Sequence, residues 1–181
     1  LTQPFKIDVT GKDIIEKEKF LFSSTNKNTI NGEYNLFVIG STWESRNYPK
    51  NQFVQIANEL KIITYIIWGS DEEYEKAIWM EKQSPYLKIL PKDSLDNLKN
   101  VISKSKLLIG NDTGPTHMAW GLNIPSITIF GPTPINRVYI TPINKVIKSS
   151  SKIDHFKLDK NDFSISEIKV ENIVKIAKML I

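Results

Sequence analysis

The sequence predicts an α/β protein in which a parallel sheet is flanked by helices. From residue 36 onward, short apolar runs alternate with amphipathic stretches, which is the pattern of such a fold. Polar or glycine-containing loops follow several of the apolar runs, as expected where parallel strands end at one edge of a sheet. The length of 181 residues, of which 40% are hydrophobic, is sufficient to bury the core of one domain.

Six short apolar runs are predicted to be strands, because such runs between turn residues are typical of a buried sheet. They comprise residues 36–40, 62–68, 86–90, 106–110, 126–130 and 145–149. The stretches between them predict helices over residues 50–61, 71–83, 94–105 and 114–123. In the third of these helices Ser94 is a suitable N-cap. Its residues Leu95, Leu98 and Ile102 share one face, which we expect to pack on the sheet.

The two ends of the chain differ from this alternating region. Residues 12–22 predict a helix, and the polar segment that follows is rich in residues typical of loops. We therefore expect residues 1–35 to be an entry segment or linker rather than a domain, and residues 36–181 to form one domain. At the other end, apolar residues at helical spacing predict a C-terminal helix, with Ser164 or Ser166 as its N-cap.

Composition argues against several classes of function. The chain has no cysteine, so it has no disulfide or thiolate metal site, and a reducing cytoplasmic setting is compatible with this. With only two histidines, His117 and His155, we expect no metal site. The net charge of +4 comes from lysines spread along the chain, which suits an anionic small ligand or an anionic membrane surface. No basic stripe with interleaved aromatic residues indicates a nucleic-acid partner.

The hydropathy of the sequence predicts neither a membrane span nor a signal peptide. No apolar stretch approaches the roughly 20 residues of a membrane span. The first residues lack the apolar core of a signal peptide, and the chain begins with Leu rather than Met, which favours a fragment or a processed chain.

Four predicted loops at the carboxyl edge of the sheet are candidates for a ligand site. Ligands of open parallel sheets bind beyond this edge, where helix N-termini present free NH groups and the positive end of the helix dipole. The four loops span residues 40–49, 68–73, 91–94 and 110–117. Each has a simpler interpretation alone, but their occurrence after successive strands of one sheet favours a single shared ligand.

The last of these loops combines residues that suit a phosphate. Asp112 or Thr113 can cap the next helix, and Gly114 lets a ligand approach the backbone. Pro115 suits the first helical turn, where its missing NH costs nothing. The alternative is that the segment is only a cap and turn, and that His117 hydrogen-bonds a neighbouring loop.

Two further loops contribute polar candidates. Ser41 and Thr42 offer hydroxyl and NH groups at the end of a strand, and Arg46 offers a planar cation for phosphate. Glu73, in the first turn of a helix, could accept hydrogen bonds from a ribose. The alternatives are an ordinary surface loop with an incidental arginine, and an acidic residue that merely complements the helix dipole.

A proline-containing loop after the fifth predicted strand brings Thr133 and Arg137 to the same edge, or is simply a stiff loop. The sequence has no GxxxxGK[ST] and no GxGxxG motif, so neither a P-loop nor the usual dinucleotide fingerprint is indicated. It also has no GxSxG motif, which argues against a hydrolase with a nucleophile elbow.

Taken together, three segments resemble a known family. "GSTWESRNYP", "WGSDEE" and "LPKDSLDNLKNVISKSKLLIGNDTGPTHMAWGLNIPSITIFGPT" resemble the C-terminal half of the lipopolysaccharide heptosyltransferases, the family 9 glycosyltransferases of GT-B fold. The resemblance covers residues 36–150 and implies a Rossmann-like domain. Within the family, the Ser-Thr loop and the Asp-Thr-Gly segment are more similar to the heptosyltransferase I branch.

The resemblance implies a role for residues in the first three loops. Ser41 and Thr42 match a hydroxyl pair near the donor phosphates. Arg46 stands where the family has a lysine that contacts phosphate, which keeps the charge but changes its shape. Glu73 matches the acid that holds the ribose, and Asp93 lies in the segment next to adenine, where we expect it to contribute its backbone only.

For the fourth loop, the resemblance implies contacts with the diphosphate and the heptose. Asp112, Thr113, Gly114 and His117 match the family residues that make them. Pro115 departs from the family in its side chain and is expected to contribute its backbone.

The implied function is inverting transfer of L-glycero-D-manno-heptose from ADP-heptose to the Kdo region of the lipopolysaccharide inner core, without a metal or other cofactor. In the family, the binding site for the acceptor, Kdo-lipid A, and the catalytic base lie in an N-terminal domain, which this chain is expected to lack. This chain alone is therefore expected to be inactive. The implied location is the cytoplasm, at the cytoplasmic face of the inner membrane. Alternatives are another GT-B transferase such as heptosyltransferase II, a nucleotide-sugar epimerase, or a non-catalytic Rossmann-like nucleotide-binding or interaction module.

Overall fold

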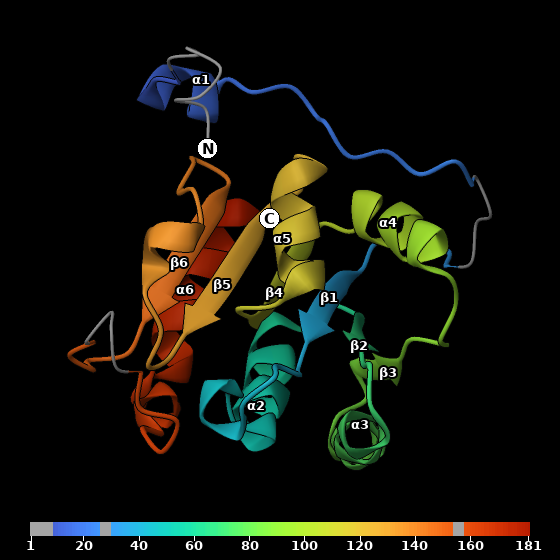
Figure 1. Ribbon diagram of the computed structural model, residues 1–181. Helices are drawn as coiled ribbons and strands as arrows, with labels where there is room; N and C mark the ends of the chain where they lie inside the picture. Colours follow the sequence, from blue (N-terminus) through green and yellow to red (C-terminus); the bar gives the residue numbers. More distant parts are fainter. Residues whose placement is uncertain (1–8, 26–29, 154–157) are drawn as a thin grey trace.

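A six-stranded sheet forms the centre of the molecule (Figure 1), and the computed structural model describes residues 9–25, 30–153 and 158–181. His155 and the side chain of Arg137 lie outside the described part. The strand order is β3-β2-β1-β4-β5-β6, and all five pairings are parallel. The strands are β1 Asn35–Val38, β2 Thr64–Ile67, β3 Leu87–Ile89, β4 Leu107–Asn111, β5 Ser126–Phe130 and β6 Asn144–Lys148. All six predicted strands are confirmed, with ends shifted by a few residues.

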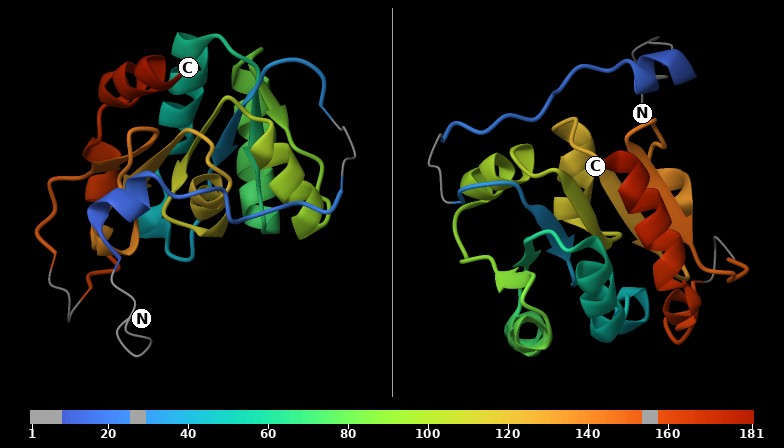
Figure 2. Two further views of the ribbon diagram at one scale, coloured as in Figure 1. Left: turned by 90° about the horizontal axis from the view of Figure 1, so that it is seen from above. Right: turned by 180° about the vertical axis from the view of Figure 1, so that it is seen from behind.

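Helices cover both faces of the sheet (Figure 2). They are α2 Lys50–Leu60, α3 Asp71–Gln83, α4 Leu95–Ser103, α5 Gly114–Gly121 and α6 Val170–Leu180. Helices α2, α3 and α6 pack on one face, and α4 and α5 on the other. Successive side chains of β1 serve the two cores in turn, because strand residues alternate in direction: Phe37 packs with the first face and Leu36 with the second.

The strand order creates a switch point between β1 and β4. From β1 the chain runs outward through β2 to β3, then returns to β4 and runs outward again through β5 to β6. Val38 at the end of β1 pairs with Gly110 of β4, so the loops that leave these two strands diverge to opposite sides. A crevice at such a point is where open α/β sheets bind their ligands.

The predicted helix over residues 12–22 is wrong in its extent. Helix α1 comprises only Gly11–Ile15, fixed by a capping box between Thr10 and Asp13. Beyond it the chain is held by α5, since the NH groups of Phe20 and Leu21 both donate to the carbonyl of Gly121. These tertiary contacts outweigh the helical propensity of the segment.

The predicted N-cap of the C-terminal helix is also wrong. Helix α6 begins at Val170 after Lys169, which makes no side-chain cap. Ser164 instead begins a short 3-10 helix, η4, at Ser164–Glu167. This turn buries Ile165 completely in the core before α6 starts, so burial of an apolar side chain decides where the helix begins.

Two buried tyrosines make the fold sensitive to alkaline pH. The hydroxyl of Tyr34 donates to the carbonyl of Val101, and that of Tyr48 to the carbonyl of Ile168, each at 2.7 Å. Burial, with a smaller effect of Tyr65, raises the pKa of Tyr34 to about 12. Burial, with a smaller effect of Glu171, also raises the pKa of Tyr48.

We expect the free energy of unfolding to fall as the pH rises above 10. Below the pKa of a tyrosine in the unfolded chain, both tyrosines are neutral in the folded and the unfolded state. Above that pKa only the unfolded state ionises readily. The resulting loss in the free energy of unfolding is about 1 kcal/mol per tyrosine at pH 11. Urea unfolding at pH 8 to 11 measures this. The Tyr34→Phe variant should show a shallower decline, with Tyr139→Phe as the control at an exposed site. Identical slopes for wild type and Tyr34→Phe would contradict the prediction.

Candidate functional site

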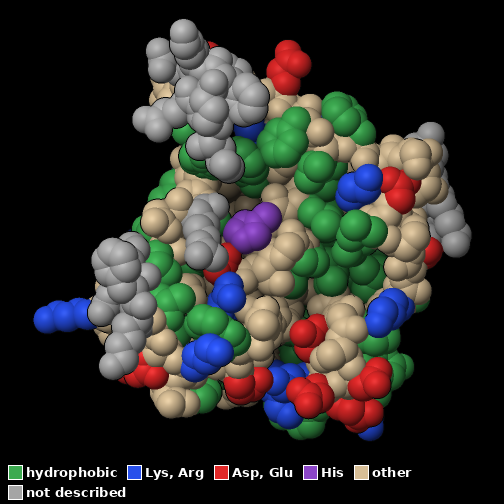
Figure 3. All heavy atoms as spheres, viewed as in Figure 1, with side chains coloured by type: hydrophobic (Ala, Val, Ile, Leu, Met, Phe, Trp, Pro, Cys, Tyr) green, Lys and Arg blue, Asp and Glu red, His purple; other side chains and the backbone are tan. Residues whose placement is uncertain are grey.

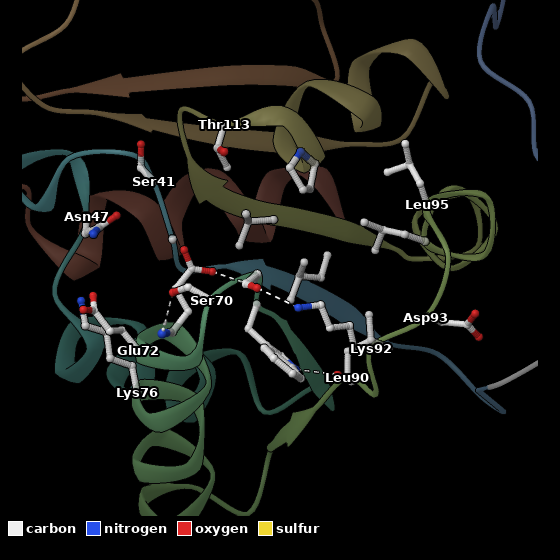
Figure 4. Close-up of a pocket in the computed structure, with 18 of the residues that line it drawn as sticks. Ser41, Asn47, Ser70, Glu72, Lys76, Leu90, Lys92, Asp93, Leu95 and Thr113 are labelled. Atoms are coloured by element: carbon white, nitrogen blue, oxygen red, sulfur yellow. Dashed lines mark hydrogen bonds between the residues drawn. The ribbon is translucent and has the colours of Figure 1, made fainter.

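A cavity of about 830 Å³ lies at the carboxyl ends of β1 to β4. Its walls come from the loops after these strands and from the first turns of α3 and α4 (Figure 4). The cavity therefore occupies the switch point, as the loop positions predict. Six of the residues predicted for the site line it: Ser41, Thr42, Glu73, Asp93, Thr113 and Pro115. The other four do not: Arg46, Asp112, Gly114 and His117.

The cavity differs in character between its two ends. The end that we call the polar end is formed by Ser41, Thr42, Asn47, Lys76 and Thr113. The opposite end, the apolar end, is formed by Leu90, Leu95, Leu98 and Val101. Figure 4 shows Asn47 and Lys76 at one side and Leu95 at the other. On the surface, hydrophobic side chains gather over α4 and α5, and charged side chains of both signs gather over α3 (Figure 3).

Glu73 lines the cavity and is held by the loop before α3. Its carboxylate accepts a hydrogen bond of 2.6 Å from the NH of Gly69, and its NH is capped by Ser70 at the start of α3. A side chain at Gly40 would displace this carboxylate from its present position, so the glycine leaves room for Glu73 beside the end of β1. Glu73 thus lines the cavity and also complements the N-terminus of α3, and the two interpretations of this residue are compatible.

Arg46, Asp112 and His117 form a cluster beside the cavity. One terminal nitrogen of Arg46 pairs with the Asp112 carboxylate and donates to its carbonyl at 2.6 Å. His117 Nε2 donates to the other carboxylate oxygen at 2.9 Å. Burial alone would raise the pKa of Asp112, but the hydrogen bond from His117 and the charge of Arg46 outweigh it, so the pKa lies below its ordinary value. The carboxylate is therefore anionic and fully engaged by its neighbours.

This cluster bears on two expectations for the loop before α5. Thr113 is the N-cap residue but makes no side-chain cap, and Asp112 is occupied by Arg46 and His117, so neither side chain caps the helix. His117 lies in α5 and bonds the adjacent loop through Asp112, as the simpler interpretation of this residue predicts. The first turn also borders a second, smaller cavity of about 130 Å³, which His117 lines. Contact of Arg46 with phosphate stays a prediction.

Asn111 is a structural residue of the site that the sequence patterns did not single out. It is fully buried at the end of β4. Its amide donates to the carbonyl of Ile39 at 2.7 Å and accepts from the NH of Tyr48 at 3.0 Å. It thereby joins the end of β4 to the loop after β1. A buried strand that ends in an asparagine was the available signal.

The wall near the apolar end contains a second feature missed in the sequence. The indole of Trp68 donates to the carbonyl of Leu90 at 2.9 Å and packs against Tyr74, with ring centroids 4.4 Å apart. Lys92 lies over the Trp68 ring and donates to the carbonyl of Gly69. These contacts make the wall near the apolar end rigid and aromatic.

Asp93 turns its carboxylate away from the centre of the cavity (Figure 4). It accepts hydrogen bonds from the NH of Ser94 and from the side chain of Asn97, at 2.6 and 2.9 Å. Ser94 caps α4 as predicted, by accepting from the NH of Asn97. The geometry is compatible with a backbone role for Asp93, which stays a prediction.

Within residues 9–25, 30–153 and 158–181, no cluster of three or more His, Cys, Asp or Glu side chains could hold a metal ion. Over the same residues, no helix combines the length and the apolar character needed to cross a membrane.

The sheet order and the position of the cavity define the class of the protein: a Rossmann-like α/β domain with a ligand-sized cavity at its switch point. The sequence model of glycosyltransferase family 9 (heptosyltransferase) matches residues 4–163. The chain belongs to this family, which confirms the resemblance drawn from the loop segments.

Known proteins support both conclusions. Lipopolysaccharide heptosyltransferase 1 of Campylobacter coli is 41% identical over 189 residues, which cover 97% of this chain and 54% of that protein. The enzyme of the same name from Escherichia coli K12 is 31% identical over 112 residues, or 60% of this chain and 35% of that protein. The chain thus spans about half the length, or less, of the curated relatives it matches.

Solved structures confirm the predicted fold class, a Rossmann-like parallel sheet flanked by helices that corresponds to one half of a GT-B enzyme. E. coli heptosyltransferase WaaC with ADP-2-deoxy-2-fluoro heptose superposes with a TM-score of 0.70 at 24% identity, covering 86% of this chain and 46% of that chain. E. coli ADP-heptose lps heptosyltransferase II gives 0.69 at 18% identity, with coverages of 82% and 46%.

Proposed function

We propose that this chain is the donor-binding half of a heptosyltransferase that transfers L-glycero-D-manno-heptose from ADP-heptose to the Kdo region of the lipopolysaccharide inner core. The observation that carries the proposal is the cavity at the switch point, with a polar end at the start of α5 and an apolar end at α4. The relatives support it, since the similar WaaC structures are described with ADP and with an ADP-heptose analogue.

The two ends of the cavity suit the two ends of an ADP-sugar. The polar end offers the hydroxyls of Ser41 and Thr42 and the backbone of Thr113 at the start of α5. The NH groups of Thr113 and of Gly114, which lies just behind the cavity lining, would bind the diphosphate. Glu73, which lines the cavity, would accept hydrogen bonds from the ribose. The apolar end would take the adenine.

The chemistry assigned to this half is stabilisation of the leaving group. An acceptor hydroxyl would attack the anomeric carbon and invert it, its proton passing to a base outside this chain. The bond between that carbon and the diphosphate oxygen would break, so negative charge develops on ADP. NH groups aimed at the diphosphate stabilise this charge without reorganisation. We expect the chain alone to bind donor but not to transfer heptose.

Acceptor and location belong to the same proposal. Kdo-lipid A would bind the other half of the complete enzyme, at the cytoplasmic face of the inner membrane. Residues 1–35 would be the interdomain linker and residues 36–181 the donor domain. β1 begins at Asn35, next to the proposed boundary, and the linker packs along α4 and α5, where Lys17 contacts the end of α5 and Ser24 contacts α4.

Calorimetry with ADP tests the donor site. Wild type should show saturable binding, and Glu73→Ala should weaken it by about tenfold, the worth of one or two hydrogen bonds to a charged group. Glu75→Ala is the matched control, because Glu75 is exposed on the same helix and does not line the cavity. A folded wild-type chain that binds neither ADP nor ADP-heptose would refute the proposal and favour a non-catalytic interaction module.

A further inference from the structure

Carboxylates outnumber cations in the described lining of the cavity. Its acidic lining residues are Glu44, Glu72, Glu73 and Asp93. Among residues 9–25, 30–153 and 158–181, its basic lining residues are only Lys76 and Lys92. An anionic ligand in this acidic surrounding depends on one of these two lysines, because helix NH groups carry only partial charge.

Arg46, the cation indicated by the sequence, is directed elsewhere. It does not line the cavity, and one terminal nitrogen of its guanidinium is used by both the carboxylate and the carbonyl of Asp112. Only 17% of its side chain is exposed. Moving it to a ligand would leave the Asp112 carboxylate, itself only 11% exposed, without its cation.

Lys92 serves the opposite end of the cavity. Its ammonium donates to the carbonyl of Gly69 at 2.9 Å and lies 4.9 Å from the centre of the Trp68 ring. Figure 4 shows it on the side of Leu90 and Asp93, away from Asn47. Lys92 therefore lies toward the end of the cavity that would take the adenine rather than toward the polar end.

Lys76 is placed at the polar end. It extends from the second turn of α3 and shares that side of the cavity with Asn47 (Figure 4). Its ammonium contacts both carboxylate oxygens of Glu44, at 2.9 and 3.1 Å. The Glu44 side chain is 65% exposed, so it can swing into solvent at little cost and leave Lys76 to another anion.

We infer that Lys76 is the cation of this domain that binds the diphosphate of the donor, and that Glu44 holds its ammonium at the polar end until the donor takes its place. The two carboxylate oxygens of Glu44 occupy the position at Lys76 that two phosphate oxygens would take. This inference rests on the proposed function and adds to it a second, ligand-facing cation beside the cluster of Arg46.

Calorimetry of the 181-residue chain with ADP, AMP and adenosine tests the assignment. Lys76→Ala should weaken ADP by about tenfold, the effect of losing one charge-assisted hydrogen bond. AMP should lose less and adenosine nothing, since only the phosphates are concerned. Lys82→Ala, an exposed lysine on the same helix, is the matched control and should bind all three like wild type. Lys76→Arg, which keeps the charge, should retain most of the affinity.

The Glu44→Gln variant is expected to change the affinity for ADP in the opposite direction. Removing the carboxylate frees Lys76 and takes a negative charge from the polar end, so ADP should bind several-fold more tightly while adenosine is unchanged. A loss of folding would not produce tighter binding, so this variant separates a role in binding from a structural one.

The outcomes distinguish this inference from the function it rests on. If wild type binds ADP and Lys76→Ala binds it as well as Lys82→Ala does, Lys76 is not the phosphate ligand and the donor site stands. If Arg46→Ala loses ADP affinity and Lys76→Ala does not, Arg46 turns to the ligand and the inference is overturned. If the folded wild type does not bind ADP, the proposed function and the inference both fail.

Discussion

Replacing Asn111 with alanine is expected to lower the free energy of unfolding by about 2 to 4 kcal/mol, the worth of two buried backbone groups left without partners. The carbonyl of Ile39 and the NH of Tyr48 both depend on the Asn111 amide, at 2.7 and 3.0 Å. Asn111 and Ile39 are fully or almost fully buried, so water cannot replace the lost hydrogen bonds without opening the core.

Urea unfolding measures this change. Asn172→Ala is the control, because Asn172 is an exposed asparagine on α6. ADP affinity should fall with Asn111→Ala as well, since the loop after β1 carries Ser41 and Thr42 into the cavity. A stability within about 0.5 kcal/mol of the control variant would show that the amide does not hold the two loops together.

Replacing Asp112 with alanine is expected to cost about 3 kcal/mol, because removing one partner of a mostly buried ion pair leaves the other charge uncompensated. The charge left behind is that of Arg46, whose side chain is 17% exposed. The Asp112→Ala/Arg46→Ala double variant should recover part of the loss. If the two single costs simply add in the double variant, the pair is not coupled.

The stability lost in the Asp112→Ala variant is expected to depend on pH. The pKa of Asp112 is lowered in the folded state, so its stabilising effect is present above the unfolded value of about 4 and is lost as the pH falls through the folded pKa. The stability difference between wild type and Asp112→Ala should therefore shrink as the pH is lowered from 5 to 3. Asp71→Ala, at an exposed position of α3, is the control.

Local patterns were sufficient for the elements of the sheet and its helices. An apolar run as short as that around Leu108, between polar turns, favours a buried strand over a helix because of its length and flanking residues. Ser94 caps α4 through a residue three positions away, a relation that the sequence contains directly. The helix predicted over residues 12–22 failed because Leu21 packs against Gly121, a contact between segments far apart in the chain.

The candidate site followed from the sequence only in outline. Parallel strands bring their carboxyl ends to one edge, so Ser41 and Thr113 could be placed at the same edge from the alternation of strands and helices alone. The sequence did not predict which of the polar side chains would face the cavity. Arg46 is 66 residues from Asp112, and Lys76 is 32 residues from Glu44.

By itself, the sequence determined the α/β class, the order of strands and helices, the loops at the carboxyl edge and the family. These depend on residue type and on spacing over a few positions. The tertiary structure alone decided that Arg46 and His117 turn to Asp112, that Asn111 joins two loops and that Lys76 reaches the polar end of the cavity. Such choices depend on distances between segments far apart in the chain. A buried charge or amide binds the nearest partner that packing supplies, because leaving it unpaired costs more than any local preference.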